Sequence, residues 1–233
     1  MSSVEIVLAT GGTGGHVFPA INLANKLKDY NCMMFFDKRF KINSKRDIKL
    51  ESYILPLCGF SGNIFHKFKF CMLLAYSCLL AIYKIKKVKP KLVIGFGSYA
   101  SFPTLLAARI FSIPIVLHEQ NIVLGMVNRL FSNYAQFIST SFPGTKYVKE
   151  EKCVLTGNFT NENIYNTHNT FNGIYNILII GGSQGSGSLD NIVVDAICNL
   201  PINVKRKIKI VQQCLKDNIS KIKILYENNN IDH

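Results

Sequence analysis

The sequence lacks several patterns that would place it in common classes of protein. Its seven cysteines are odd in number and scattered, and none forms a C-x-x-C pair. Disulfide frameworks and zinc sites need paired or closely spaced cysteines, so we expect buried thiols in a reducing compartment. The N-terminus has no basic segment before its short apolar run, and we expect no secretory signal. No Asp-x-Asp pair occurs, which removes the simplest two-carboxylate clamp, and we expect neither a metal site nor a cofactor.

Acidic residues are scarce, with 14 against 27 lysines and arginines and a net charge of +13. This imbalance predicts an acidic partner, for which nucleic acid, an anionic membrane and a phosphorylated substrate all qualify. The basic residues frame an apolar segment and do not interleave with polar ones, so we do not expect nucleic acid. With 233 residues, of which 48% are hydrophobic, the chain can bury a core and hold more than one domain.

A glycine-rich turn follows the first apolar run. Val4–Ala9 predicts a short buried strand, Thr10–Ala20 contains four glycines, and Ile21–Leu27 has helical spacing. A strand, a glycine turn and a helix N-terminus in this order form an anion site, because backbone N–H groups point at the ligand. Pro19 is expected in the first helical turn, where its missing donor costs nothing. His16 adds a titratable group at the mouth of the turn.

Apolar runs and helical patterns alternate along the chain, which predicts an α/β fold with a parallel sheet wrapped by helices on both faces. The expected strands are Val4–Ala9, Cys32–Phe36, Leu92–Gly95, Ile115–Leu117, Phe137–Ser139, Ile177–Ile180 and Ile208–Val211. The expected helices include Ile21–Leu27, Ile64–Val88, Thr104–Phe111 and Val127–Phe131. Ligands in such sheets bind at the carboxyl ends of the strands. The functional loops are therefore expected at Thr10–His16, Gly95–Ser101 and His118–Asn121.

The composition divides the chain into two domains. We expect a Rossmann-like domain over residues 1–160, a linker over 161–175 rich in Asn, Thr and Gly, and a second domain over 176–233. The second domain begins like a nucleotide fold, with a turn over 181–187 that forms a credible diphosphate cradle before a helix. It is much shorter than the ~100–150 residues typical of a domain, so we expect it to be incomplete.

Two other functional interpretations start from incomplete motifs. Gly12-x-Gly14 with Asp37 at the end of the second strand is typical of a dinucleotide-binding oxidoreductase, but Val17 stands in place of the third glycine. A zinc protease would need a second histidine where Ile122 stands. His118 is either a strand-end histidine satisfied by backbone or, with the three polar residues after it, part of a polar ligand site.

The segment 64–91 contains fourteen apolar residues, Phe70–Tyr83, flanked by lysines on both sides. Fourteen residues are too few for a bilayer core, which needs ~20. One face is expected to pack on the sheet while the other enters the lipid interface, with lysines on anionic head groups. The alternative is an ordinary buried helix with solvated flanks.

The chain resembles one family, the UDP-N-acetylglucosamine transferases of peptidoglycan synthesis (the MurG family). The resemblance rests on segments that occur in order along nearly the whole chain. They are Gly11–Ala20, Ser61–Asn63, Gly95–Tyr99, His118–Asn121 with Gly125 and Asn128, Phe142–Gly144, Gly157–Asn158 and Gly181–Gly185.

The resemblance implies a GT-B glycosyltransferase, with two Rossmann-like domains facing across a cleft. It implies inverting transfer of GlcNAc from UDP-GlcNAc to the lipid-linked MurNAc-pentapeptide. It also implies a peripheral membrane protein on the cytoplasmic face of the bacterial inner membrane. The reaction needs a base for the acceptor hydroxyl, for which His16 is the first candidate and Glu119 the second. The remaining assignments by resemblance are Thr13, Gly14, Gly15, Asn121, Ser183 and Gln184 as donor contacts, and Tyr99 and Asn128 on the acceptor side.

Two departures from the family pattern bear on activity. Asn161 stands where the family has an arginine facing the donor. The family's segments for uracil and the ribose hydroxyls have no counterpart in the sequence. We therefore expect either an enzyme that a separate polypeptide carrying the C-terminal half completes, or a non-catalytic remnant that keeps the acceptor and membrane face.

Overall fold

The computed structural model describes residues 4–40, 50–60, 63–160, 173–181 and 187–233. Contacts divide the chain into two units, Met1–Ile164 and Tyr165–His233, and each is described by itself. Residues 161–172 of the expected linker lie outside the described residues.

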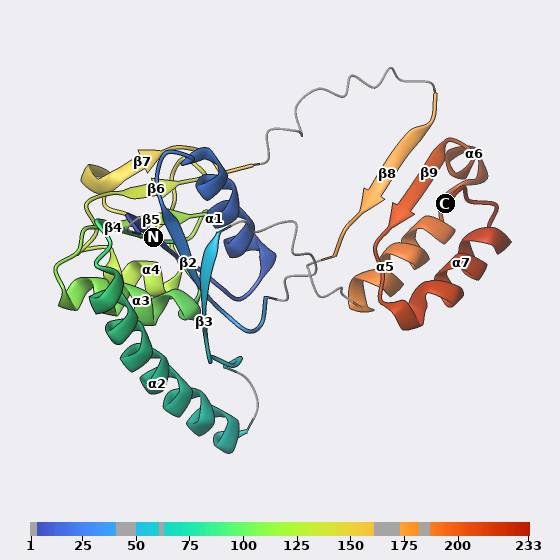
Figure 1. Ribbon diagram of the computed structural model, residues 1–233. Helices are drawn as coiled ribbons and strands as arrows, with labels where there is room; N and C mark the ends of the chain where they lie inside the picture. Colours follow the sequence, from blue (N-terminus) through green and yellow to red (C-terminus); the bar gives the residue numbers. More distant parts are fainter. Residues whose placement is uncertain (1–3, 41–49, 61–62, 161–172, 182–186) are drawn as a thin grey trace. The chain divides into compact units, whose positions relative to one another are not determined.

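The first unit is built on a seven-stranded parallel sheet in the order β3-β2-β1-β4-β5-β6-β7 (Figure 1). The strands are β1 (Ile6–Ala9), β2 (Cys32–Asp37), β3 (Glu51–Leu55), β4 (Leu92–Gly95), β5 (Ile115–Glu119), β6 (Ile138–Thr140) and β7 (Cys153–Leu155). Its helices are α1 (Gly14–Lys26), α2 (Ile64–Val88), α3 (Phe102–Ile110) and α4 (Met126–Phe131). The order reverses between β1 and β4, so the expected doubly wound α/β fold is confirmed.

Each face of this sheet has its own apolar core, because successive side chains of a strand point to opposite faces. On one face, Val17, Ala20 and Ala24 of α1 pack with Leu8 and Met34 of the sheet. On the other face, helices α2, α3 and α4 pack against the alternate residues of the same strands. This second core contains Val7, Ala9, Met33, Phe35, Ala81, Ile85, Leu105, Ala107 and Phe131. Burial on both faces explains why β1, β2 and β4 read as continuous apolar runs.

Helix α2 has the predicted bounds, and its N-terminal half extends beyond the sheet (Figure 1). A stripe of four residues, Phe70, Ser77, Ala81 and Ile85, is buried. The helix ends at Lys89, whose left-handed backbone (φ 52°) accompanies the closing hydrogen bond from its N–H to the Ile85 carbonyl. The fourteen-residue apolar run predicted from the sequence is shorter than the apolar part of this helix. At 25 residues, it is long and apolar enough to cross a membrane by length and composition alone.

Helix α1 begins at Gly14, seven residues before the predicted start at Ile21. His16 therefore lies in the first helical turn, directly after the glycine turn. Pro19 lies inside the helix, so its predicted place in the first turn is wrong. A proline at this position has no N–H to give to the carbonyl of Gly15, four residues earlier.

Two strands escaped the sequence prediction, β3 and β7, which form the two edges of the sheet. β3 is mostly exposed and β7 is fully exposed, so neither shows the apolar run of an interior strand. The cysteines also differ from expectation. All seven are free thiols, but Cys71 and Cys153 are exposed and Cys32 is the buried one among them.

The second unit pairs two parallel strands, β8 (Tyr175–Ile179) and β9 (Ile208–Gln212). Its helices are α5 (Gly187–Cys198), α6 (Ile202–Lys205) and α7 (Ile219–Asn228). Helices α5 and α7 cover one face of the pair, and the core there includes Val194, Ile208, Ile210, Ile222 and Tyr226. On the other face, Leu178 and Val211 are register partners and are 64% and 60% exposed. This unit thus has one packed face and one bare apolar face within its described residues.

Candidate active site

The candidate site lies where the strand order of the first unit reverses, at the carboxyl ends of β1, β4 and β5. The loop after β1 carries the glycine turn and leads into α1, while the loop after β4 carries Phe96, Gly97 and Ser98. A reversal point of this kind opens a crevice between diverging loops, which is where ligands bind in parallel sheets. All three loops predicted as functional start from these strands.

His16 is held by the main chain of one neighbouring loop and by a side chain from another. Its Nδ1 lies 2.9 Å from the carbonyl oxygen of Phe96 and 3.1 Å from Oε1 of Gln120. The carbonyl oxygen of His16 in turn accepts a hydrogen bond of 2.8 Å from the Thr10 hydroxyl. Helix α1 therefore presents the imidazole toward the loops after β4 and β5.

Gly97 lets the loop after β4 approach this imidazole closely. Its φ of 81° lies in the left-handed region that favours glycine. A Cβ on Gly97 would lie 3.3 Å from Nδ2 of Asn128 and 3.5 Å from the ring of His16. A side chain there would crowd the Asn128 amide and strain the backbone, so the position favours glycine.

Glu119 is buried, and both of its carboxylate oxygens already accept hydrogen bonds. Oε1 accepts from the main-chain N–H and the side-chain Nδ2 of Asn121, at 3.1 and 3.0 Å. Oε2 accepts from the N–H of Gly125 at 2.8 Å and from Nδ2 of Asn128 at 2.9 Å. Glu119 therefore ties the loop after β5 to the start of α4.

His118 and Glu119 both belong to β5, which runs two residues further than predicted. As neighbours in a strand, they point to opposite faces of the sheet. His118 lies between the rings of Phe96 and Phe159, and its Nδ1 is 2.8 Å from the Ser139 hydroxyl. Burial lowers the pKa of His118 against the opposing effect of Asn158, so the ring is neutral. The Ser139 hydroxyl is thus a hydrogen-bond partner of this ring.

Sequence reasoning missed Arg39, which sits beside the glycine turn. Its guanidinium pairs with the buried carboxylate of Asp37 and donates a hydrogen bond of 3.2 Å to the Ser98 hydroxyl. It also stacks 4.0 Å from the centroid of the Tyr99 ring. A Cβ on Gly12 would lie 2.9 Å from this guanidinium. The signal in the sequence was a basic residue two positions after the acidic end of a strand.

Tyr99 faces Arg39 with its ring and the main chain with its hydroxyl. The hydroxyl donates a hydrogen bond of 2.6 Å to the carbonyl of Cys58. Burial raises the pKa of Tyr99 to about 12, against the lowering effect of the Arg39 charge. The phenol therefore stays protonated and donates this bond at physiological pH.

Apart from Tyr99, the predicted site residues fall into three groups. His16, Glu119, Asn121 and Asn128 gather with Gln120 around the loop after β5. Thr13 and Gly15 are exposed at the start of α1, and Gly14 is buried there. Ser183 and Gln184 lie outside the described residues. Asn128 is fully buried, with its Nδ2 bonded to Glu119 and to the His118 carbonyl.

Comparison with known proteins assigns the family. Residues 6–140 match the model of the glycosyltransferase family 28 N-terminal domain. The chain is 56% identical over 231 residues to a UDP-N-acetylglucosamine--N-acetylmuramyl-(pentapeptide) pyrophosphoryl-undecaprenol N-acetylglucosamine transferase of Wolbachia pipientis, covering 98% of this chain and 65% of the relative. It is 41% identical to the protein of the same name from Anaplasma marginale, covering 98% and 66%. The chain thus spans about two thirds of the length of these relatives.

Solved structures agree with this assignment. The crystal structure of Acinetobacter baumannii MurG matches with a TM-score of 0.66 and 26% identity, covering 98% of this chain and 64% of that protein. A putative UDP-N-acetylglucosamine 2-epimerase from Listeria monocytogenes shares the fold at a TM-score of 0.64 and 11% identity, covering 96% and 66%. The dinucleotide-binding interpretation is therefore set aside. The chain belongs to glycosyltransferase family 28, and its relatives within that family are N-acetylglucosamine transferases of the MurG type.

Proposed function

We propose that this chain is the acceptor- and membrane-facing part of an inverting N-acetylglucosaminyltransferase that uses UDP-GlcNAc and the lipid-linked MurNAc-pentapeptide. The family and the names of the relatives support this reaction. The observation that carries the proposal is the placement of His16, a titratable side chain fixed at the carboxyl ends of β1, β4 and β5.

In this reaction the C4 hydroxyl of the acceptor attacks the anomeric carbon of GlcNAc. The new glycosidic bond forms as the bond from that carbon to the diphosphate breaks, and UDP leaves with the electron pair. The hydroxyl proton passes to the unprotonated ring nitrogen of His16, which acts as general base. We keep His16 as the base in preference to Glu119, because both oxygens of Glu119 are already engaged by the loop that it organises.

The remaining site residues take roles that their positions support. The exposed start of α1, with Thr13 and Gly15, offers N–H groups that favour negative charge and suits the donor side. Asn121 keeps its side-chain oxygen for the donor while its Nδ2 binds Glu119. We assign Tyr99 to the acceptor side beside the Arg39 cation. Asn128 is too deep to touch an acceptor, and we assign it to holding Glu119 in place. Ser183 and Gln184 remain proposed diphosphate contacts.

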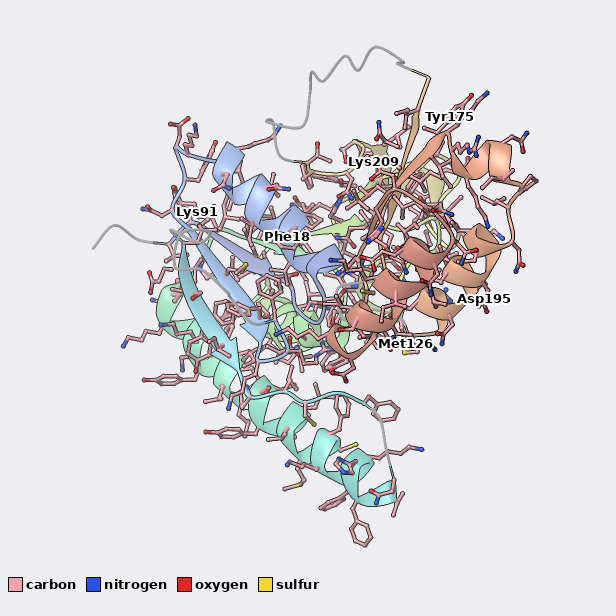
Figure 2. All side chains as sticks on the ribbon, turned by 90° about the vertical axis from the view of Figure 1, so that its right-hand side faces the viewer. Phe18, Lys91, Met126, Tyr175, Asp195 and Lys209 are labelled. Atoms are coloured by element: carbon pink, nitrogen blue, oxygen red, sulfur yellow. The ribbon has the colours of Figure 1, made fainter. Side chains whose placement is uncertain are left out.

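Helix α2 supports attachment to an anionic membrane surface. Its exposed apolar side chains recur every three or four residues, on the side away from the buried stripe. They are Phe65, Phe68, Met72, Tyr76, Leu79 and Tyr83. Figure 2 shows side chains standing out around the projecting half of this helix. Lys86 and Lys87 are exposed near its C-terminal end, whereas Lys84 lies 5.4 Å from the Tyr53 ring. Apolar side chains flanked by lysines favour an interfacial helix over an ordinary buried one.

The bare face of the second unit supports the need for a complementary polypeptide. Parallel sheets are normally covered on both faces, yet Leu178 and Val211 expose most of their surface side by side. The relatives are longer than this chain by about a third of their length. We propose that further polypeptide covers this face and completes the donor site.

Transfer of labelled GlcNAc from UDP-GlcNAc to a short-chain lipid acceptor tests the proposal. The assay uses the full chain mixed with the complementary C-terminal part of the Wolbachia relative. His16→Ala should cut turnover about a hundredfold or more, since positioned general bases contribute roughly 10²–10⁴-fold. Gln136→Ala, at an exposed position just before β6, is the control and should leave turnover unchanged.

Each outcome of the assay has a definite meaning. Near-normal turnover of His16→Ala would remove His16 as the base and make Glu119 the better choice. The absence of transfer by the wild-type mixture, with both parts folded and bound to each other, would favour the non-catalytic remnant.

A further inference from the structure

We propose that Gln120 is a positioning residue which, together with the Phe96 carbonyl, holds the neutral His16 ring with its proton on Nδ1. This inference deepens the function proposed above and rests on His16 being the base. The consequence is that Nε2 carries the free electron pair and is the nitrogen that receives the acceptor proton.

The groups around Nδ1 of His16 decide which ring nitrogen carries the proton. The carbonyl oxygen of Phe96, at 2.9 Å, can only accept a hydrogen bond. A contact of this length is favourable only if Nδ1 bears hydrogen, because two lone pairs facing each other repel. The neutral imidazole holds one N–H, so its Nε2 is unprotonated.

The Gln120 amide is oriented with its oxygen toward His16. Its Oε1 lies 3.1 Å from Nδ1 and accepts a share of the same N–H. Rotating the amide by half a turn would place its NH₂ group against an N–H, which loses that interaction. The observed orientation instead leaves Nε2 of Gln120 buried without a hydrogen-bond partner. An unpaired buried donor costs free energy. The amide keeps this orientation despite that cost, because its oxygen accepts the hydrogen bond from His16.

The side chain beside Nδ1 of His16 is an amide and not a carboxylate. A negative charge beside Nδ1 would favour the charged imidazolium and weaken His16 as a base near neutral pH. The ionic groups nearby are engaged elsewhere: Asp37 pairs with Arg39, and Glu119 binds the loop on the opposite face of β5. Gln120 thus orients the ring without adding charge, which suits a base that must be neutral before it acts.

Nitrogen-15 NMR of the histidine rings in the full chain tests the tautomer without any catalytic assay. The signals of His16 are assigned by their loss in His16→Ala. We expect the wild-type ring above its titration midpoint to carry hydrogen on Nδ1 and a lone pair on Nε2. In Gln120→Met, which has similar length and no acceptor, the share of Nδ1–H should fall. In Gln120→Glu the midpoint should rise by about one to three pH units, as expected for an opposite charge at this distance.

Gln136→Glu, which adds the same charge at an exposed position, is the matched control and should leave His16 unchanged. A wild-type ring protonated on Nε2 would overturn the proposal. So would a tautomer and a midpoint that Gln120→Met and Gln120→Glu both leave unaltered. In the transfer assay, Gln120→Glu should move the acid limb of the pH profile upward by the same amount as the NMR midpoint. A confirmed tautomer with no loss of turnover in His16→Ala would refute the proposed base and leave the role of Gln120 standing.

Discussion

The buried carboxylate of Asp37 accepts a hydrogen bond of 2.8 Å from the main-chain N–H of Gly12, twenty-five positions earlier in the chain. The end of β2 therefore shapes the glycine turn after β1. The same carboxylate pairs with Arg39, so both of its oxygens are engaged inside the protein. In the sequence, an acidic residue at this position is typical of dinucleotide binding. Here Asp37 instead binds Gly12 and Arg39 within the protein.

Asp37→Ala should destabilise the fold, because it leaves the Gly12 N–H and the Arg39 guanidinium without their partner. We expect a loss of about 3 kcal/mol in the free energy of unfolding, the scale for a buried ion pair broken on one side. Asp37→Asn, which keeps an acceptor for Gly12, should cost less. Urea unfolding followed by circular dichroism measures both variants. Equal stability of Asp37→Ala and wild type would show that the turn keeps its shape unaided.

Glu119→Ala should also act on stability, since four hydrogen bonds converge on this carboxylate. The variant leaves donors of Asn121, Gly125 and Asn128 without this acceptor, at about 1–3 kcal/mol for a donor that water cannot reach, such as the amide of the fully buried Asn128. Glu119→Gln should keep part of the network and lie between wild type and Glu119→Ala. Hydrogen exchange at the Gly125 amide reports the change locally. Unchanged protection of that amide in Glu119→Ala would contradict the organising role.

Membrane binding should depend on the exposed face and the flanking lysines of α2. Replacing Lys86 and Lys87 with Glu should weaken binding to anionic vesicles at least thirtyfold, at ~1 kcal/mol for each lysine lost. Raised salt should weaken wild-type binding in the same direction. Lys216→Glu with Lys221→Glu makes the same change of charge on exposed residues of the second unit and is the control. Equal loss in both double variants, measured by vesicle sedimentation, would mean that net charge and not α2 directs binding.

The stability of the first unit should depend on pH through His118. Burial lowers the pKa of this side chain below its ordinary value of 6.5, so the unfolded chain takes up a proton that the folded chain resists. The free energy of unfolding should therefore fall as the pH drops below about 6.5 and stay level above it. His118→Gln should flatten this slope, whereas His66→Gln on the exposed start of α2 should not. Urea midpoints between pH 5 and pH 8 measure the slopes, and parallel slopes for wild type and His118→Gln would refute the assignment.

The interior strands of the sheet were predicted well, because a strand that is buried on both faces has a continuous run of apolar residues. Strands β1 and β4 follow that rule, and their bounds differ little from the prediction. The edge strands β3 and β7 are exposed, so their sequences carry no such run. The start of α1 was missed because glycines give a weak helical signal, although they lie in the first turn of that helix.

The candidate site was predictable only in part. The polar loop after β5 stood out because four hydrogen-bonding side chains follow one another. Arg39 did not stand out, because its partner Ser98 lies 59 positions away and only the parallel pairing of the sheet brings the two together. The engagement of Glu119 by four donors was likewise invisible, since Asn128 reaches it from a separate helix.

The bare face of the second unit also has a consequence for the chain in a cell. An exposed apolar face favours association with other chains, and the unpaired edges of a two-stranded sheet can accept further strands. Without the cover proposed above, newly made chains would therefore associate with one another or be handled by chaperones and proteases.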